Sequence, residues 1–525
     1  MRKLLLASAA MLGATSGIAS AQGPSPAGAS LMMQPSQGQI ALPWSSGPSV
    51  NNNNNTLQAS GYVGGAKYGT NAVPTPGTVV IRLNGRFEAE MIAAWSTNHK
   101  VSLPASANAG TVSNAGVATA GVTVPAWTAQ ANPITLNSYI RFYPGVDGMA
   151  TNGLRYGAGV ELRVNVPGSA GQPAPAPGAA ATAASGIGGA APGPSTYNTG
   201  QTVYVRRAFG YVAADSFGLL RYGITDGVIS LFDPGIFSGA GIDGGMGSLN
   251  GAAPQGSGVT GAFGVPYVLA QAGAEYGNAK IVYLTPQFFG FDLGIQYAPS
   301  MGNGFSSCAQ AGFACNSATS GNDPTRWYNQ VAVGARWQGA MGPVALGIYG
   351  LYETASKESF TGGAPTLSGG AQRVTGNRYD NLSFVSIGAY GVLNSGIGAI
   401  TASLTYQGGA VNNQLAMRPT GGASQNQFVG GLQWRNGPLV VGTQFNIITS
   451  QGAAQLTGVS QRNEFALAVA ATYSIAPGLN VWAEYQYARR HQGGFDFVTG
   501  AVPTATTVTR DGKGQAAIIG TSVSW

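Results

Sequence analysis

The stretch VVIRLNGRFEAEMIAAW, at residues 79–95, alternates between two kinds of side chain. Its odd-numbered positions are apolar or small, whereas charged residues such as Arg82 and Glu90 occupy even-numbered positions. Because successive side chains of a β-strand point to opposite faces, this alternation predicts a strand with one apolar and one charged face. Most strands of a soluble sandwich have only about 5 or 6 residues, and this one is long enough to cross a bilayer at a tilt.

The period of two returns in later segments, which are joined by links of two lengths. Alternation recurs at residues 154–165, 289–297, 329–338, 400–407, 428–435 and 465–473, and it is poor at residues 379–392. Short turn-like links at residues 214–216, 436–438 and 476–478 alternate with long polar segments at residues 166–200, 226–274 and 300–327. Short turns at one end and long loops at the other are typical of a membrane β-barrel. The sequence therefore predicts an all-β, antiparallel transmembrane barrel of about sixteen strands, give or take about two, over residues 79–525.

The composition is compatible with such a barrel. Hydrophobic residues make up 44% of the chain and charged residues only 8%, well below the ~25% of an average soluble domain. With 82 glycines and no apolar stretch of spanning length, the chain is either a disordered, low-complexity secreted protein or a membrane barrel with apolar residues at alternate positions. The regular alternation favours the barrel.

The N-terminal segment has the features of an export signal. Arg2 and Lys3 precede an apolar run at residues 4–12, and Ala19-Ser20-Ala21 supplies the small residues that signal peptidase requires. We expect a signal peptide at residues 1–21, because the apolar run is too short for a membrane anchor of ~20 residues. Residues 22–78 are rich in Pro, Gly, Ser and Asn and lack any period, which predicts an extension that is either a spacer or a binding arm.

Charge and cysteine content exclude several classes of partner. The formal charge is +7, but no Lys/Arg-rich run suggests nucleic-acid binding. Cys308 and Cys315 are the only cysteines, and in a Gly/Ser/Asn-rich segment of an exported chain we expect them to form a disulfide. A metal site would need His or further Cys nearby, so we expect neither a metal nor another cofactor.

Aromatic residues gather toward the ends of the expected strands. This distribution predicts girdles at the two membrane interfaces, although Tyr and Trp also favour strands in general. The aromatic residues concerned are Trp95, Tyr143, Tyr156, Tyr297, Trp337, Tyr352, Tyr406, Trp434 and Trp525.

Several stretches, in this order, resemble the Gram-negative general porin family and in particular its alphaproteobacterial members. They are VVIRLNGRF at residues 79–87, RRAFG at 206–210 followed by SFGLLRYG at 216–223, and NAKIVYLTP at 278–286 followed by Phe289-Gly290-Phe291. The resemblance covers about residues 79–525. It implies an outer-membrane trimer of about sixteen-stranded barrels, each a passive water-filled channel for small hydrophilic solutes and ions. Small outward residues Gly85, Ala89 and Ala93 would allow close packing between subunits.

The resemblance also implies an infolded third loop that narrows each pore, here from Thr225 to about Ala272. Enteric members carry Pro-Glu-Phe-Gly in this loop, whereas this chain has Asp233-Pro234-Gly235-Ile236-Phe237. Acidic residues on the loop would face an arginine ladder on the barrel wall. The candidate loop acids are Asp226, Asp233 and Asp243.

The C-terminal residues suggest how the barrel is assembled. Ile519, Thr521, Val523 and Trp525 keep an alternating pattern, although most family members end in Phe. The resemblance implies that the barrel assembly machinery reads this pattern through Trp525. Outer-membrane lipid and lipopolysaccharide are the other expected partners, beside a second and third copy of the chain.

Inward positions of the first strands carry the expected pore-lining charges. These are Arg82, Arg86, Glu88, Glu90, Arg141, Arg155, Glu161, Arg163 and Arg206. They form either the arginine ladder or a set of charges that only solvates the lumen. Because the glutamates partly offset the arginines, the positive balance predicts no more than a weak anion preference.

The alternatives to a general channel are an enzyme, a barrel with a closed lumen and a sugar-selective porin. The only histidines are His99 and His491, both in expected loops and neither near a nucleophile motif, so we expect no catalytic residue and no enzyme. The glycine-rich match at residues 239–244 is expected by chance among 82 glycines. A structural or adhesive barrel with a closed lumen, to which residues 166–200 could contribute, and a sugar-selective porin both stay open.

Overall fold

The protein is described by a computed structural model at residues 75–96, 100–103, 106–107, 123–124, 127–130, 134–165, 203–214, 216–225, 227–232, 278–286, 288–301, 327–341, 343–357, 379–412, 418–452, 456–476, 478–495 and 511–525. Several predictions fall outside these residues. They concern the signal peptide, the extension up to residue 74, the segment at residues 166–200, Asp226, Asp233, Asp243, His99, Cys308 and Cys315.

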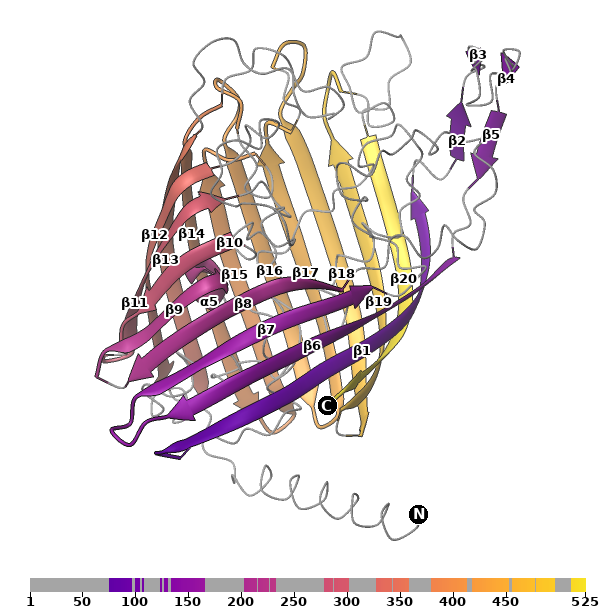
Figure 1. Ribbon diagram of the computed structural model, residues 1–525. Helices are drawn as coiled ribbons and strands as arrows, with labels where there is room; N and C mark the ends of the chain where they lie inside the picture. The colour runs from indigo at the N-terminus through magenta and orange to yellow at the C-terminus, as the bar shows by residue number, and fades with distance from the viewer. Residues whose placement is uncertain are drawn as a thin grey trace, which may run out of the picture.

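Sixteen antiparallel strands form one closed barrel (Figure 1), which confirms the predicted fold class and strand number. β20 pairs with β1 and closes the ring, with Gly520 opposite Glu90. The strands are β1 (Thr78–Ser96), β6 (Ile134–Met149), β7 (Arg155–Asn165), β8 (Val203–Ala214), β9 (Gly218–Thr225), β10 (Asn278–Leu284), β11 (Phe291–Met301), β12 (Trp327–Met341), β13 (Val344–Lys357), β14 (Leu382–Ser395), β15 (Gly398–Gly409), β16 (Gln425–Asn436), β17 (Leu439–Ser450), β18 (Arg462–Ala476), β19 (Leu479–His491) and β20 (Asp511–Ser524).

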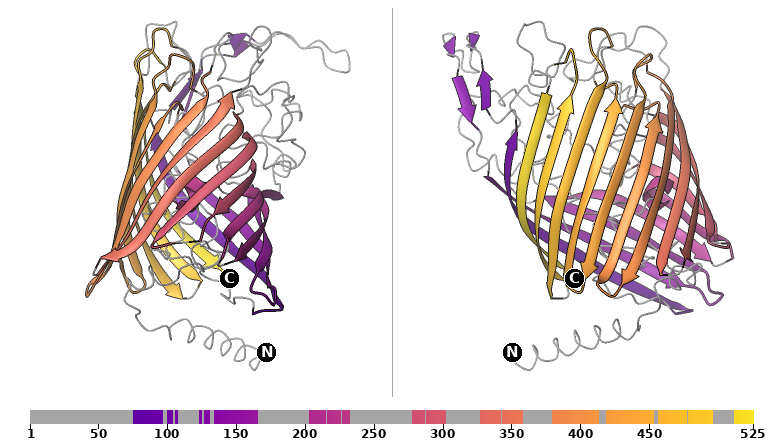
Figure 2. Two further views of the ribbon diagram at one scale, coloured as in Figure 1. Left: turned by 90° about the vertical axis from the view of Figure 1, so that its left-hand side faces the viewer. Right: turned by 180° about the vertical axis from the view of Figure 1, so that it is seen from behind.

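The connections follow the predicted rule of two lengths. The predicted short turns join β8 to β9, β16 to β17 and β18 to β19. The connection between β1 and β6 is longer and contains two small ladders, β2 (Lys100–Leu103) with β5 (Trp127–Gln130) and β3 (Ser106–Ala107) with β4 (Thr123–Val124), which lie beyond the barrel rim (Figure 2). The sequence did not predict these ladders, because their strands are too short to show a period.

The two faces of the wall differ in polarity. Outward side chains of β1 such as Ile81 and Leu83 are 72% and 74% exposed, whereas Glu88 on the opposite face is 1% exposed. β20 alternates in the same way, with Ile519 exposed and Ser522 buried. The barrel is therefore apolar outside and largely polar inside. No helix in the described part of the chain is long and apolar enough to span a membrane.

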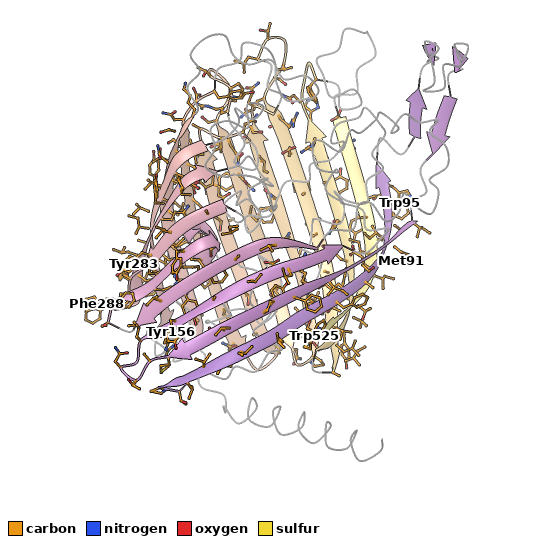
Figure 3. All side chains as sticks on the ribbon, viewed as in Figure 1. Met91, Trp95, Tyr156, Tyr283, Phe288 and Trp525 are labelled. Carbon is orange, nitrogen blue, oxygen red and sulfur yellow. The ribbon has the colours of Figure 1, made fainter. Side chains whose placement is uncertain are left out.

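Most of the described aromatic residues expected in the girdles point outward, although their level in the membrane stays a prediction. Trp95, Tyr156 and Trp525 are 42%, 42% and 44% exposed and lie on the outside of the barrel (Figure 3). For Tyr143 the prediction is wrong, because its side chain is only 4% exposed and shares the inner face with Arg141. Tyr143 is one residue out of phase with the exposed Phe142, and position near a strand end does not decide the face.

The junction of β1 and β20 is closed by Trp525. Its backbone N–H and C=O both pair with Gly85, at 3.1 Å each. The indole covers Gly85, where a β-carbon would lie 2.2 Å from Cζ2 of Trp525, and it meets Phe142 edge-on at 5.8 Å between ring centroids. This indole, and not a neighbouring subunit, fills the space beside Gly85.

Candidate functional site

Three arginine positions form a row across the inner wall. Arg86 of β1 pairs in register with Arg141 of β6, and Arg141 pairs with Arg163 of β7. The side chains of Arg86 and Arg141 are 2% and 3% exposed and face the lumen. The row places positive groups side by side on adjacent strands, as the ladder hypothesis requires.

Acidic side chains lie on the same face as this arginine row. Nη1 of Arg86 is 2.9 Å from Oε1 of Glu88, so β1 compensates one of its own charges. Glu90 and Glu161 are also inward, at 3% and 0% exposure. The inner face of β1, β6 and β7 is therefore a mixed field of both signs.

The remaining predicted wall residues fall into three groups. Arg155 occupies the same face of β7 as Glu161 and is partly exposed. Arg82 and Arg163 hold inward register positions, but their side chains lie outside the described set. Arg206 falls where the pairing of β7 with β8 shifts by one residue, so alternation no longer assigns its face, and its role stays a prediction.

Several inward charges were not predicted, most of them beyond the first strands, although the same alternation could have found them. Arg490 on β19 pairs with Glu464 on β18, and the hydroxyl of Tyr211 donates to Asp147. The further buried charges of the inner wall are Arg221, Lys280, Asp292, Arg336, Glu353 and Glu484.

A short helix, α5 (Val228–Phe232), is held at both ends by the inner wall. The backbone N–H of Val228 donates to Oε1 of Gln296 on β11 at 2.6 Å. Nη1 of Arg336 on β12 donates to the carbonyl of Leu231 at 3.2 Å, and its guanidinium lies 4.9 Å from the ring centre of Phe232. Free N–H groups at the start of a helix and free carbonyls at its end need such partners.

Arg336 is itself fixed by a carboxylate. Its Nε and Nη2 donate to Oδ1 and Oδ2 of Asp292 on β11, at 3.0 and 2.6 Å. Two parallel bonds to one carboxylate are stronger and more directional than a single bond. Arg336 therefore reaches α5 from a fixed position.

Apolar contacts also hold α5 against the inner wall. Two glycines of the inner wall make room for it: a β-carbon at Gly294 would lie 2.8 Å from Val228, and one at Gly334 would lie 3.2 Å from Phe232. The buried cluster around α5 contains Phe209, Tyr211, Leu219, Val228, Ile229, Phe232, Val282, Leu284, Tyr349, Leu351, Ala355, Leu382, Phe384 and Val411. Because inward positions of β14 join this cluster, they are apolar too, which explains the poor alternation at residues 379–392.

A closed barrel with an apolar outer face and charged, amide-rich inner face is a membrane-spanning β-barrel of the channel type. A sequence model described as Gram-negative porin matches residues 7–493. The chain belongs to this family and is an outer-membrane porin. No curated protein sequence matches it.

Several solved structures are similar to this chain at low sequence identity. A loop L8 deletion mutant of OmpT, an outer membrane protein of Vibrio cholerae, is 10% identical, with a TM-score of 0.43 over 85% of this chain and 99% of that chain. OmpT of Vibrio cholerae in a trimer form is 9% identical, with a TM-score of 0.43 over 85% and 100%. An anion-selective porin from Comamonas acidovorans is 13% identical, with a TM-score of 0.42 over 85% and 100%.

Proposed function

We propose that this porin is a passive, water-filled channel for small hydrophilic solutes and ions. The arginine row on the inner wall of a closed barrel is the observation that carries the proposal, because charged groups on the wall of a channel bias the ions that pass it. Purified protein in a planar lipid bilayer should give stepwise current increases. A structural or adhesive barrel with a closed lumen would give none.

No catalytic role is part of the proposal. His491 lies 3.1 Å from Asp511, with side chains 49% and 57% exposed at the end of β19 and β20 that carries the long connections. Their pairing crosses two neighbouring strands, and neither residue contacts a nucleophile in the part of the chain that the structure describes. Such an exposed pair is typical of a solvated surface contact.

The loop after β9 is proposed to enter the lumen and narrow it. The contacts of α5 with Gln296 and Arg336 support this, since α5 begins three residues after β9 ends and lies against the inner wall. In the ring, β19 and β20 lie half a circuit away from β11 and β12, and β1 follows β20. Because α5 lies against β11 and β12, it faces the part of the wall that β19, β20 and β1 form. The acids of that loop would then meet Arg86 and its neighbours across the lumen.

Ion preference depends on which charges lie at the narrowest level. The weak anion preference predicted from the sequence rests on the positive balance of the expected inward charges on the first strands. Among fully buried wall residues that the structure describes, however, acids outnumber bases. The bases are Arg86, Arg141, Arg221, Lys280, Arg336 and Arg490, and the acids are Glu88, Glu90, Asp147, Glu161, Asp292, Glu353, Glu464 and Glu484.

Neutralising the arginine row tests its part in ion selection. In the double variant Arg86→Gln/Arg141→Gln, the reversal potential in a salt gradient should shift toward cations, because two positive groups are removed from a partly desolvated wall. The matched variant Glu88→Gln should shift it toward anions. Both shifts should shrink at ~1 M salt, where the Debye length is ~3 Å. Unchanged potentials at low salt would show that these residues line a wide part of the pore.

A homotrimer is proposed to use the outer face of β1 and β6. Leu83 and Leu136 are 74% and 70% exposed there. In Leu83→Trp, the larger ring should disturb subunit packing, so heat-sensitive trimers on mild detergent gels should be lost. The control Leu404→Trp on β15, where Leu404 is 55% exposed, should keep them because lipid accommodates the ring. A monomeric mass for the unaltered protein by light scattering would refute the assembly.

The assembly partners and the disulfide stay predictions. Lipopolysaccharide, outer-membrane lipid and the barrel assembly machinery are expected to contact the outer face and Trp525. Cys308 and Cys315 are expected to be oxidised to each other in the exported protein. Labelling of unfolded, unreduced protein should find no free thiol.

A further inference from the structure

The connection between β10 and β11 carries large apolar side chains in exposed positions. Phe288, Phe289 and Phe291 are 73%, 84% and 56% exposed, and the rings of Phe288 and Phe289 meet edge to face at 4.4 Å between their centroids. We call residues 288–291 the Phe turn. By contrast, the short turn from β16 to β17 consists of Asn436-Gly437-Pro438, which are typical turn residues. An exposed apolar turn indicates a partner other than water.

The backbone of the Phe turn is strained at Phe289. The N–H of Phe288 donates to the carbonyl of Phe291 at 2.7 Å, and the reverse bond measures 2.9 Å, so Phe289 and Gly290 form a two-residue hairpin loop. Their φ angles are 50° and 85°, as in a type I′ turn, whose first position favours Asn, Asp or Gly. Among the described residues, Asn329 is the only other non-glycine residue with a positive φ. A left-handed phenylalanine disfavours folding roughly tenfold, so turn preference does not explain Phe289.

The neighbouring strand fixes the position of the Phe turn. The N–H of Gln338 on β12 donates to the carbonyl of Gly290 at 2.8 Å. A β-carbon at Gly290 would lie 2.5 Å from the carbonyl oxygen of Gln338, so only glycine allows this approach. The ring of Phe291 also lies 6.5 Å from that of Trp337 on β12. The Phe turn is therefore part of the wall, and its exposed rings are held in place.

The Phe turn continues the apolar outer face of the barrel. Phe288 and Phe291 are bridge partners, and directly opposite residues of antiparallel strands share a face. Leu293 and Ile295 follow Phe291 on the outer face of β11, at 54% and 47% exposure. Figure 3 shows Phe288 at the edge of the barrel, with its ring directed away from the wall. An uninterrupted apolar surface thus runs from the membrane-facing wall to the tip of the turn.

We propose that the Phe turn is a membrane anchor, with the rings of Phe288 and Phe289 inserted into the lipid leaflet at the short-turn end of the barrel. Lipid is the partner of the outer face with which the turn is continuous, and aromatic rings favour the boundary between headgroups and acyl chains. Removal of one Phe side chain from water is favourable by about tenfold or more, so two inserted rings offset the strain at Phe289. The proposal rests on the membrane location of the barrel and not on conduction.

The first test measures which small reagents reach the Phe turn in lipid vesicles. Phe289→Cys carries a nitroxide spin label, and Cys308→Ser/Cys315→Ser in every variant leaves the label a single site. Oxygen concentrates in the apolar part of a bilayer, whereas a polar nickel chelate stays in water. The label at position 289 should collide more with oxygen, as should one in Leu404→Cys on the outer face of β15. In Asn436→Cys, at the exposed polar turn, the nickel chelate should dominate.

The second test measures what one ring contributes to stability. In Phe288→Ala, the folding equilibrium constant in vesicles, from urea titration, should fall at least about tenfold because a ring is lost from the lipid. The control Asn436→Ala should change it about twofold or less, as is usual for an exposed position.

Each alternative result has a distinct meaning. Equal access of the nickel chelate to labels at positions 289 and 436, or an effect of Phe288→Ala no larger than that of the control, places the turn in water and overturns the anchor. A label that neither reagent reaches shows that a second copy of the chain covers the turn, which overturns the assignment to lipid. Neither result bears on the channel function, which the bilayer recordings test separately.

Discussion

Gly85→Leu is expected to reduce the yield of folded barrel at least about tenfold, because it removes the space that Trp525 occupies at the junction of β1 and β20. A β-carbon at position 85 would already lie 2.2 Å from the indole. Overpacking alone costs ~1–3 kcal/mol, and loss of the paired backbone bonds between Gly85 and Trp525 adds ~1–3 kcal/mol. Mobility of unheated and heated samples on detergent gels measures the folded fraction.

Gly350→Leu is the matched control for this experiment. Gly350 also lies on the outer face, on β13, and its nearest neighbour to an added β-carbon is Cγ1 of Ile387 at 4.0 Å. A leucine there should point into lipid and leave the yield unchanged. Equal yields of the two variants would mean that the indole moves aside without cost. Restoration of folding by Trp525→Ala in the Gly85→Leu background would confirm the steric cause.

Releasing α5 from the wall is expected to make the channel noisier and its open current larger. In Arg336→Met/Asp292→Asn the bond to Leu231, the contact with Phe232 and the buried ion pair are lost together, and no single charge is left unpaired. These contacts hold α5 by about 2–4 kcal/mol, so the released state should become at least about thirtyfold more populated. Single-channel recordings measure both quantities.

The ion pair of Arg490 and Glu464 supplies the control for the release of α5. Arg490→Met/Glu464→Gln removes one positive and one negative charge from the inner wall on β18 and β19, which contribute no residue to the buried cluster around α5. The open-channel current of this double variant should be no noisier than that of the unaltered protein. Equal noise in both double variants would assign the effect to lost wall charge, and the proposed placement of the loop would lose its support.

Local alternation in the sequence was enough to predict the class of fold, the strand number and the faces of several wall residues. Arg86, Glu88, Glu90, Arg141 and Glu161 are inward as predicted, because the face of a residue follows from a period of two within its own strand. The predicted short turns were also found. Prediction failed where the period broke, as at the register shift that contains Arg206, since a slip of one residue reverses the face.

Tertiary structure decided which distant residues meet. Arg336 and Asp292 are 44 positions apart, and Arg336 and Leu231 are 105 apart, so no local pattern could bring them together. The row of Arg86, Arg141 and Arg163, the indole over Gly85 and the bond from Gln427 to Asn446 likewise depend on the register of paired strands and on closure of the ring. The sequence by itself determined the two faces of the wall, because side-chain direction is local. Only the closed barrel determined the contacts across that wall, because register and closure depend on all of its strands together.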